Sequence, residues 1–130
     1  MKILQFAFSG PDNVFLPDHY TENCVVYTGT HDNDTTLGWY QTAPEAERDF
    51  ARTYLHVDGS DFAWDLIRAA WASRAVFALA PMQDFLNLGP EARMNFPGQP
   101  TGNWTWRLVE DDLSDPLREK IRALNLQYKR

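Results

Sequence analysis

The sequence predicts an α/β fold with a parallel β-sheet, and three observations lead to that prediction. Three short runs, at residues 2–8, 24–28 and 75–80, have the length of strands and are apolar throughout instead of alternating. Strands of this kind have both faces buried, which is typical of parallel sheets covered by helices. Helical patterns lie between the second and third runs and after the third, and the order β, β, α, α, β, α indicates an α/β protein.

The composition is that of a globular segment and excludes several functional classes. With 44% hydrophobic and 14% aromatic residues among 130, the chain is not a disordered tail. No run reaches the ~20 apolar residues of a membrane span, and the opening residues are too quickly polar for a secretory signal. A net charge of −6 with 12 scattered basic residues argues against nucleic acid as a partner. The single cysteine, Cys24, excludes an internal disulfide and favours a cytoplasmic location.

The first half of the chain contains two predicted strands, each followed by polar residues. The strand at 2–8 ends at the turn-forming cluster Ser9–Asn13. The second, at 24–28, stops at Gly29 and leads into a polar stretch that continues to Thr36. We therefore expect two strand ends rich in hydrogen-bonding groups.

Two helices are predicted before the third strand. Residues 42–45 (TAPE) resemble a capping box with proline in the first turn, and they predict a helix with Phe50 and Tyr54 on one face that stops by Gly59. Ser60-Asp61 would cap the second helix. Its apolar face repeats at helical spacing and consists of Ala63, Ile67, Ala70 and Trp71.

The third strand, at 75–80, ends at Pro81, and a long ordered loop is expected from Leu88 to Trp106. A last amphipathic helix should begin at the cap formed by residues 114–116. Its predicted inward face is made of Leu117, Ile121, Leu124 and Tyr128. Strands that are apolar on both faces leave open sheet edges, so we expect residues 1–130 to form one segment, without an internal boundary, of something larger.

Functional residues in a parallel α/β sheet gather at the carboxyl ends of the strands. Three such ends are rich in polar groups here: Ser9–Asn13, Thr28–Thr36 and Pro81–Asp84 with the loop beyond it. The second is the densest, because His31, Asp32, Asn33 and Asp34 follow one another in it. The alternative interpretation is that these side chains only stabilise the local turn, as Asp, Asn and Thr often do.

Metal binding by this polar stretch is not favoured. A calcium loop starting at Asp32 would need glycine where Leu37 stands and glutamate where Ala43 stands. No second histidine or cysteine lies at zinc-ligand spacing from His31. We expect neither a metal nor another cofactor.

The long loop has the composition of a sugar-binding surface. Indole rings stack on the apolar faces of sugars, and amide and guanidinium groups hydrogen-bond to hydroxyls. The residues of this kind in the loop are Arg93, Asn95, Asn103, Trp104, Trp106 and Arg107. Trp64 and Trp71 lie on a predicted helix face and are expected in the core instead.

Two long motifs make the sequence recognisable. YTGTHDNDTTLGW at 27–39 and RMNFPGQPTGNWTWR at 93–107 resemble the C-terminal part of the 4-α-glucanotransferases, the amylomaltases or disproportionating enzymes of glycoside hydrolase family 77. The opening MKILQFAF and the run AVFALAPMQDFLNLG at 75–89 match the same family. The resemblance covers essentially the whole chain.

The resemblance implies the C-terminal portion, about the last three strands, of a (β/α)8 TIM barrel that is incomplete in this chain. It implies transfer of α-1,4-glucan segments, through a covalent glycosyl-enzyme, to the 4-hydroxyl of glucose or another glucan in starch, glycogen or maltodextrin metabolism. Such retaining chemistry needs a nucleophile and an acid/base ~5–5.5 Å apart. In the family both lie upstream of this sequence, and Glu91 and Glu110 match no catalytic motif. We therefore expect the chain alone to be inactive.

The resemblance also assigns roles to residues. Asp32 matches the third catalytic carboxylate, which stabilises the transition state, and His31 matches its neighbouring donor-sugar contact. Substrate contacts are further predicted for Asn33, Asn95, Asn103 and Trp104. The expected partners are maltooligosaccharides and either the missing N-terminal part of the barrel or a second copy at the exposed sheet edges. The alternatives are a non-catalytic carbohydrate-binding module and a functionless remnant that associates through its edges.

Overall fold

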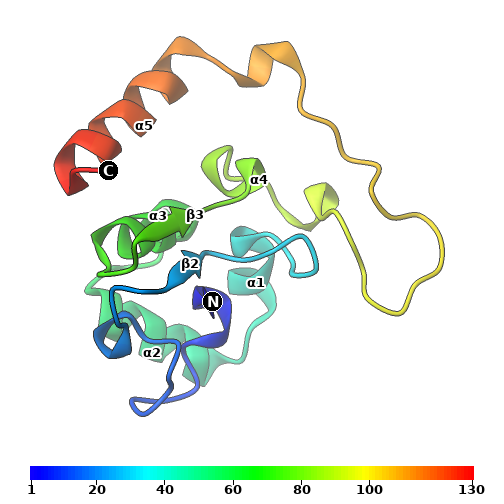
Figure 1. The fold of residues 1–130 in the computed structure, drawn as a ribbon. Helices are drawn as coiled ribbons and strands as arrows, with labels where there is room; N and C mark the ends of the chain where they lie inside the picture. The colour runs from blue at the N-terminus through cyan, green and yellow to red at the C-terminus, as the bar shows by residue number, and fades with distance from the viewer.

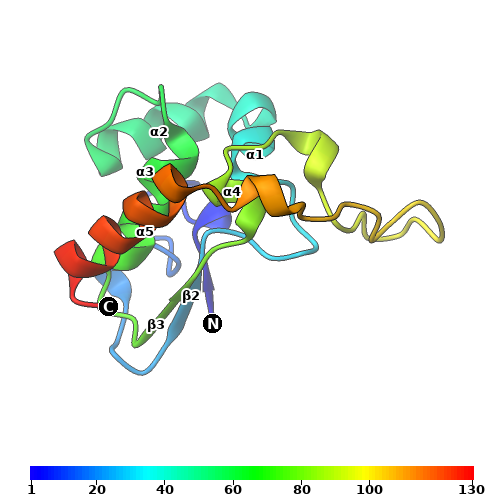
Figure 2. The same ribbon diagram turned by 90° about the horizontal axis from the view of Figure 1, so that it is seen from above.

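The computed structural model describes all 130 residues and contains a parallel three-stranded sheet in the order β1-β2-β3 (Figure 1). Val26 in the central strand lies opposite Lys2 on one side and Ala78 on the other. The helices lie on one side of the sheet, as seen from above in Figure 2. No helix is long and apolar enough to cross a membrane. The elements are β1 Lys2–Ile3, β2 Val25–Tyr27, α1 Thr36–Thr42, α2 Glu45–Leu55, α3 Phe62–Ala72, β3 Phe77–Leu79, α4 Met82–Phe85 and α5 Asp115–Tyr128.

The parallel sheet is confirmed, but its strands are shorter than the apolar runs that predicted them. The predicted strand at 2–8 is wrong beyond Ile3, because Leu4–Phe6 form a 3-10 turn. Leu4, Ala7 and Phe8 are all buried, and this spacing of three and four residues is that of a helical turn and not of a strand. The apolar run therefore fills the core without extending the sheet.

The expectation that every strand is buried on both faces is wrong for β3. Phe77 is 62% and Leu79 43% exposed, whereas Val26 in β2 is fully buried. Phe77 and Leu79 share one side of the strand, because side chains alternate along it. The sheet is thus covered by helices on one face only. On its other face the β3 side chains Phe77 and Leu79 are exposed in this chain.

The polar stretch after β2 leads into α1, a helix that the sequence analysis did not predict. Thr35 caps it, since its Oγ1 accepts a hydrogen bond from the backbone N of Gly38 at 3.1 Å. The predicted capping box at 42–45 is wrong: Thr42 closes α1, with its hydroxyl donating to the Gly38 carbonyl, and α2 follows Pro44 without a side-chain cap. Helix α4 was also not predicted.

Helix α3 forms the centre of the core, and the prediction that its two tryptophans are core residues is confirmed. Trp64 and Trp71 are 4% and 9% exposed, and each meets the Phe85 ring edge-on, at 5.7 and 5.8 Å between centroids. Asp61 precedes the helix as predicted, but its side chain makes no capping bond. The core position of these rings fixes α4, which carries Phe85, against α3.

Helix α5 packs on α3 and begins where predicted, with the Ser114 hydroxyl accepting from the Leu117 backbone N at 3.3 Å. Of its predicted inward face, Leu124 is buried and Leu117, Ile121 and Tyr128 pack partly buried against the core. The indole N–H of Trp71 donates to Asn125 at 2.8 Å. Between α4 and α5 the chain runs through the long loop, which extends away from the body of the molecule (Figures 1 and 2).

Candidate functional site

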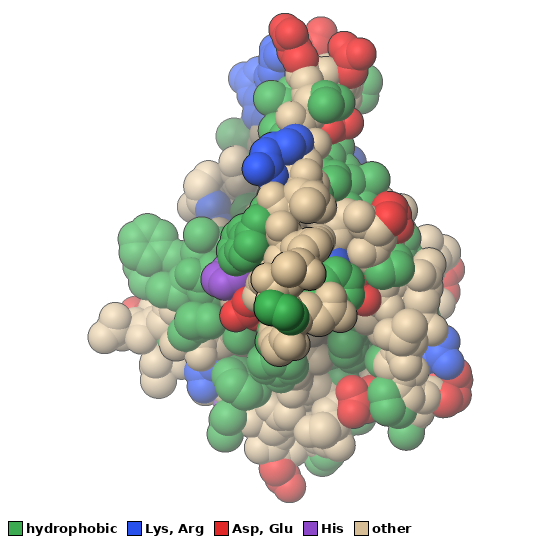
Figure 3. Space-filling model, turned by 90° about the vertical axis from the view of Figure 1, so that its right-hand side faces the viewer, with side chains coloured by type: hydrophobic (Ala, Val, Ile, Leu, Met, Phe, Trp, Pro, Cys, Tyr) green, Lys and Arg blue, Asp and Glu red, His purple; other side chains and the backbone are tan.

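Two loops meet beyond the carboxyl end of the sheet. One, at 28–35, follows β2, and the other, at 88–107, follows α4. The backbone N of Asn95 donates to the His31 carbonyl at 3.1 Å, and the Arg93 guanidinium donates to the Asp32 carbonyl at 2.8 Å. Figure 3 shows this side of the molecule, with hydrophobic side chains gathered beside a histidine and an acidic group. The polar groups that follow β2 and β3 meet here as predicted. The third predicted group, Ser9–Asn13, does not join them, because Asn13 makes its hydrogen bonds with Phe6, Ser9 and His19.

Asp32 lies where the two loops meet. Its Oδ1 accepts from the Asn95 Nδ2 at 2.8 Å, and the His31 Nε2 lies 3.3 Å from the same oxygen. The side chain is 51% exposed, and its second oxygen has no protein partner. One oxygen is therefore fixed by the protein, while the other can accept a hydrogen bond from a ligand.

His31 and Trp104 form an exposed aromatic surface beside this carboxylate. Their ring centroids are 5.0 Å apart at an interplanar angle of 39°. Trp104 is 49% exposed and has a positive φ of 61°, a conformation that costs a non-glycine residue about 1–2 kcal/mol. Its backbone N donates to the Met94 carbonyl at 2.7 Å, which holds the ring in place despite that cost. Strained residues of this kind cluster at functional sites.

The structure brings together His31, Asp32, Asn95 and Trp104, but it engages Asn33 and Asn103 within their own loops. The Asn33 side-chain oxygen accepts from the Thr30 N and Oγ1 at 2.8 and 2.9 Å. Asn103 accepts from the Phe96 backbone N and donates to the Gln99 carbonyl, both at 2.9 Å. Stabilisation of the local turn, the alternative given for the first loop, therefore describes Asn33 geometrically. Glucan contacts by these two side chains stay predictions.

The buried groups beneath the site were not predicted from the sequence. Asp84 in α4 is 1% exposed and accepts hydrogen bonds from Thr28 and Thr36, the residues at the two ends of the first loop. Burial raises the pKa of this carboxyl above its ordinary value, although the three hydrogen bonds it accepts act in the opposite direction. The end of the third strand at Pro81–Asp84 had been noted as polar, but its sequence gives no partner for this side chain.

Two cavities at this site share His31 in their lining. A small one of about 90 Å³ is lined by His31, Asn33, Gln83, Asp84 and Met94 among others, and a more open one of about 450 Å³ by Met1, Tyr27, Leu79 and His31 among others. The structure contains no group of three His, Cys, Asp or Glu residues that could hold a metal ion.

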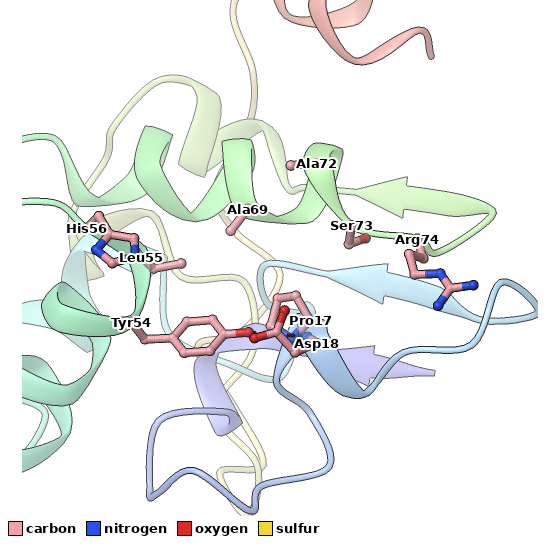
Figure 4. Close-up of a pocket in the computed structure, with 9 residues that line it drawn as sticks. All are labelled: Pro17, Asp18, Tyr54, Leu55, His56, Ala69, Ala72, Ser73 and Arg74. Carbon is pink, nitrogen blue, oxygen red and sulfur yellow. Dashed lines mark hydrogen bonds between the residues drawn. The ribbon is translucent and has the colours of Figure 1, made fainter.

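The largest pocket, of about 620 Å³, lies elsewhere, between Pro17-Asp18 and the ends of α2 and α3 (Figure 4). Tyr54 points across it toward Pro17 and Asp18, and its hydroxyl accepts from the Asp18 backbone N at 3.2 Å. None of the predicted site residues lines it.

Comparison with known proteins decides the family. Residues 1–112 match the glycoside hydrolase family 77 profile, described as 4-alpha-glucanotransferase. The chain belongs to this family. It is 50% identical to the 4-alpha-glucanotransferase of Thermus thermophilus over 133 residues, which covers 95% of this chain and 27% of that protein. It is 43% identical to the chloroplastic/amyloplastic 4-alpha-glucanotransferase of Solanum tuberosum, over 95% of this chain and 22% of that protein.

A solved structure is similar over the whole chain. The chain matches the amylomaltase from Streptococcus agalactiae, determined in complex with acarbose, with a TM-score of 0.93 and 29% sequence identity. The match covers 100% of this chain and 27% of that one. This 4-alpha-glucanotransferase family member therefore spans about a quarter of the length of the relatives it matches.

Proposed function

We propose that this chain acts as the C-terminal portion of a retaining 4-α-glucanotransferase, in which it supplies the carboxylate that stabilises the transition state. The observation that carries the proposal is the placement of Asp32: half exposed, fixed through one oxygen, and located beyond the carboxyl end of a parallel sheet in a member of this family. In (β/α)8 enzymes the active site lies on that face of the barrel. Its predicted substrates are α-1,4-glucans.

The geometry suggests how Asp32 would act. Positive charge develops on the donor sugar in the oxocarbenium-like transition state, and a fixed carboxylate stabilises that charge without having to reorganise. The hydrogen bond from Asn95 holds Asp32 in place, while the free oxygen faces solvent, from which a sugar hydroxyl would approach. His31 and Trp104 offer an aromatic surface on which the apolar face of a sugar can stack.

The nucleophile and the acid/base would come from the rest of the barrel. A single carboxylate cannot form the covalent intermediate and transfer the proton as well, so we expect no turnover by this chain alone. The partner is proposed to cover the exposed face of β3, where Phe77 and Leu79 lie open, and to pair with the free edges of β1 and β3. We propose one segment, 1–130, in a cytoplasmic enzyme.

The test joins residues 1–130 to the N-terminal part of the Thermus thermophilus relative, in place of its matching segment. Glucose release from maltotriose measures activity. We expect the joined protein to be active and Asp32→Asn to lower kcat about 10²–10³-fold, with KM changed much less. The matched control is Asp111→Asn, an exposed carboxylate outside the two loops, which should have no effect. An Asp32→Asn protein with unchanged kcat would refute the proposed role.

A second measurement uses the chain by itself. Titration of the isotopically labelled chain with acarbose, followed by NMR, should perturb the resonances of His31, Asp32 and Trp104 first. Glucose release from maltotriose by the chain alone, at concentrations that exclude a contaminant, would overturn the expectation that it is inactive. Acarbose binding without activity of the joined protein would favour a carbohydrate-binding module.

A further inference from the structure

A buried carboxylate without a cationic partner lies beneath the site. Asp84 is 1% exposed and accepts three hydrogen bonds: from the Thr28 hydroxyl at 2.6 Å, from the Thr36 hydroxyl at 2.8 Å and from the Thr36 backbone N at 2.8 Å. Burying a charge is costly unless its partners compensate, and here all of them are neutral.

The donors to Asp84 identify what it holds. Thr28 is the first residue of the loop that carries His31 and Asp32, and Thr36, the first residue of α1, directly follows the loop. Both hydroxyls donate to the same oxygen, Oδ2 of Asp84, so that one carboxylate oxygen closes the loop at its two ends. The ends cannot separate without breaking one of these bonds.

A second polar side chain, in the 3-10 turn that follows β1, reinforces this closure. The Gln5 amide, 3% exposed, donates to the Asp34 carbonyl at 3.0 Å and to the Thr36 hydroxyl at 3.3 Å. Gly29 makes room for it, since a Cβ at this position would lie 2.5 Å from the Gln5 Nε2. The loop backbone at Gly29 is therefore packed directly against the Gln5 side chain, and position 29 has no room for a larger residue.

The residue before Asp84 holds the other loop. Gln83 is 7% exposed, and its amide donates to the Ala92 carbonyl at 3.1 Å. Ala92 directly precedes Arg93, which donates to the Asp32 carbonyl, and lies three residues before Asn95, which donates to the Asp32 carboxylate. Two adjacent buried residues of α4 thus bind the two loops that meet at Asp32.

We infer that Asp84, together with Gln83, is a positioning unit that sets the His31–Asp32 loop in register against the Asn95 loop. Asp84 acts through Thr28 and Thr36 and is not a catalytic residue. The effect of this unit on catalysis rests on the proposed function. Its effect on the relative position of the two loops does not, because that concerns their structure alone. The unit makes the placement of Asp32 a property of the fold and independent of bound glucan.

The informative variant is Asp84→Ala, which removes the acceptors of all three hydrogen bonds at once. Asp84→Asn is the conservative variant: its amide group can donate to both threonine hydroxyls, which then accept, and its carbonyl can accept from the Thr36 backbone N–H. We therefore expect Asp84→Asn to retain most of the closure that Asp84→Ala loses. The matched control is Asp65→Ala, at a partly buried carboxylate on α3 that pairs with Arg68 away from both loops.

The experiment is NMR of the full 130-residue chain without ligand. In Asp84→Ala we expect loss of the cross-relaxation between the His31 and Trp104 rings and amide exchange at Thr36 at least tenfold faster, with the core resonances unchanged. Asp65→Ala should keep both signals, and Asp84→Asn should keep them largely. A folded Asp84→Ala chain with the native ring contacts and exchange rate overturns the inference. If Asp84→Ala does not fold, Thr28→Val, which removes one donor only, takes its place under the same criteria.

A kinetic measurement separates positioning from a general structural role. In the protein joined to the Thermus thermophilus part, Asp84→Ala should lower kcat at least tenfold while KM for maltotriose stays within about threefold, because the misplaced group is one that acts in the transition state. Asp84→Asn should restore most of kcat. Equal changes in the two constants would contradict positioning of Asp32. If the unmodified joined protein is inactive, the proposed function fails, while the NMR result still decides the inference.

Discussion

Trp104 offers a quantitative test of glucan binding by the site. We consider Trp104→Ala, which removes the exposed indole beside His31 and leaves the backbone in place. The large aromatic side chains bury roughly 150–250 Å² when fully covered, and Trp104 is 49% exposed, so on the order of 100 Å² of it is open to a ligand. A sugar stacked on one ring face would cover a good part of that area.

The expected magnitude follows from this area. At about 25 cal/mol per Å², the coverage of ~60–100 Å² contributes about 1.5–2.5 kcal/mol to binding. Part of this is offset by ordering of the ligand, so we expect a loss of about 1–2 kcal/mol, or 5- to 30-fold in the dissociation constant. Loss of the His31 contact, with rings 5.0 Å apart in the native chain, should also release the His31 ring.

The assay is titration of the chain with acarbose, followed by NMR and by calorimetry. Trp104→Phe retains a ring face and should bind within about threefold of the native chain. Leu126→Ala, at a residue 72% exposed on α5, is the control for an unrelated change in exposed apolar surface and should have no effect. Unchanged affinity of Trp104→Ala would refute the stacking argument. Equal weakening by alanine and phenylalanine would assign the contact to the indole N–H instead of the ring face.

Three further predictions concern the support of the site and the fold. Asn95→Ala removes the 2.8 Å bond to Asp32 and should lower kcat of the joined protein by about tenfold, measured as glucose release, while Asn95→Asp should be worse because it repels the carboxylate. Because burial raises the pKa of Asp84, the folded chain binds more protons than the unfolded one above pH ~4, so the free energy of unfolding should fall as the pH rises through that window. Urea denaturation at several pH values from 4 to 7 should show that the free energy of unfolding falls less steeply with pH in Asp84→Asn. An identical dependence on pH in the two chains would contradict this. Leu124→Ala, at a side chain 4% exposed between α5 and α3, should cost about 2–4 kcal/mol in urea denaturation, against under about 0.5 for Leu126→Ala.

The parallel sheet and the position of the site could be predicted because both depend on local patterns. Apolar runs of strand length with helices between them indicate a parallel sheet, and the carboxyl ends of parallel strands lie at one edge. His31 and Asp32 lie in the loop after the second run, and Asn95 and Trp104 lie in the loop after the third one. The meeting of these four residues therefore follows from the topology and from the two family motifs.

The supporting structure could not be predicted, because it depends on contacts between distant residues. Asp84 meets Thr28 and Thr36 across 56 and 48 positions of sequence, and nothing near Asp84 distinguishes it from a surface carboxylate. The 3-10 turn at Leu4–Phe6 was missed for a related reason: an apolar run satisfies a strand and a buried turn equally well when only composition is considered.

The origin of the contacts around Asp32 has a consequence for the assembly of the enzyme. Its carboxylate is held by Asn95, its carbonyl by Arg93 and its backbone N by the Thr30 hydroxyl, all within these 130 residues. A preorganised carboxylate need not be reoriented when its partner groups arrive, which is the property that makes electrostatic stabilisation effective. We therefore expect the remaining part of the barrel to add the two missing carboxylates and cover Phe77 and Leu79, while the geometry at Asp32 stays as it is. If the NMR spectra of the loop residues change little when the barrel is completed, the geometry at Asp32 forms before the partner binds. A rearranged His31–Trp104 pair would show that the partner shapes the site.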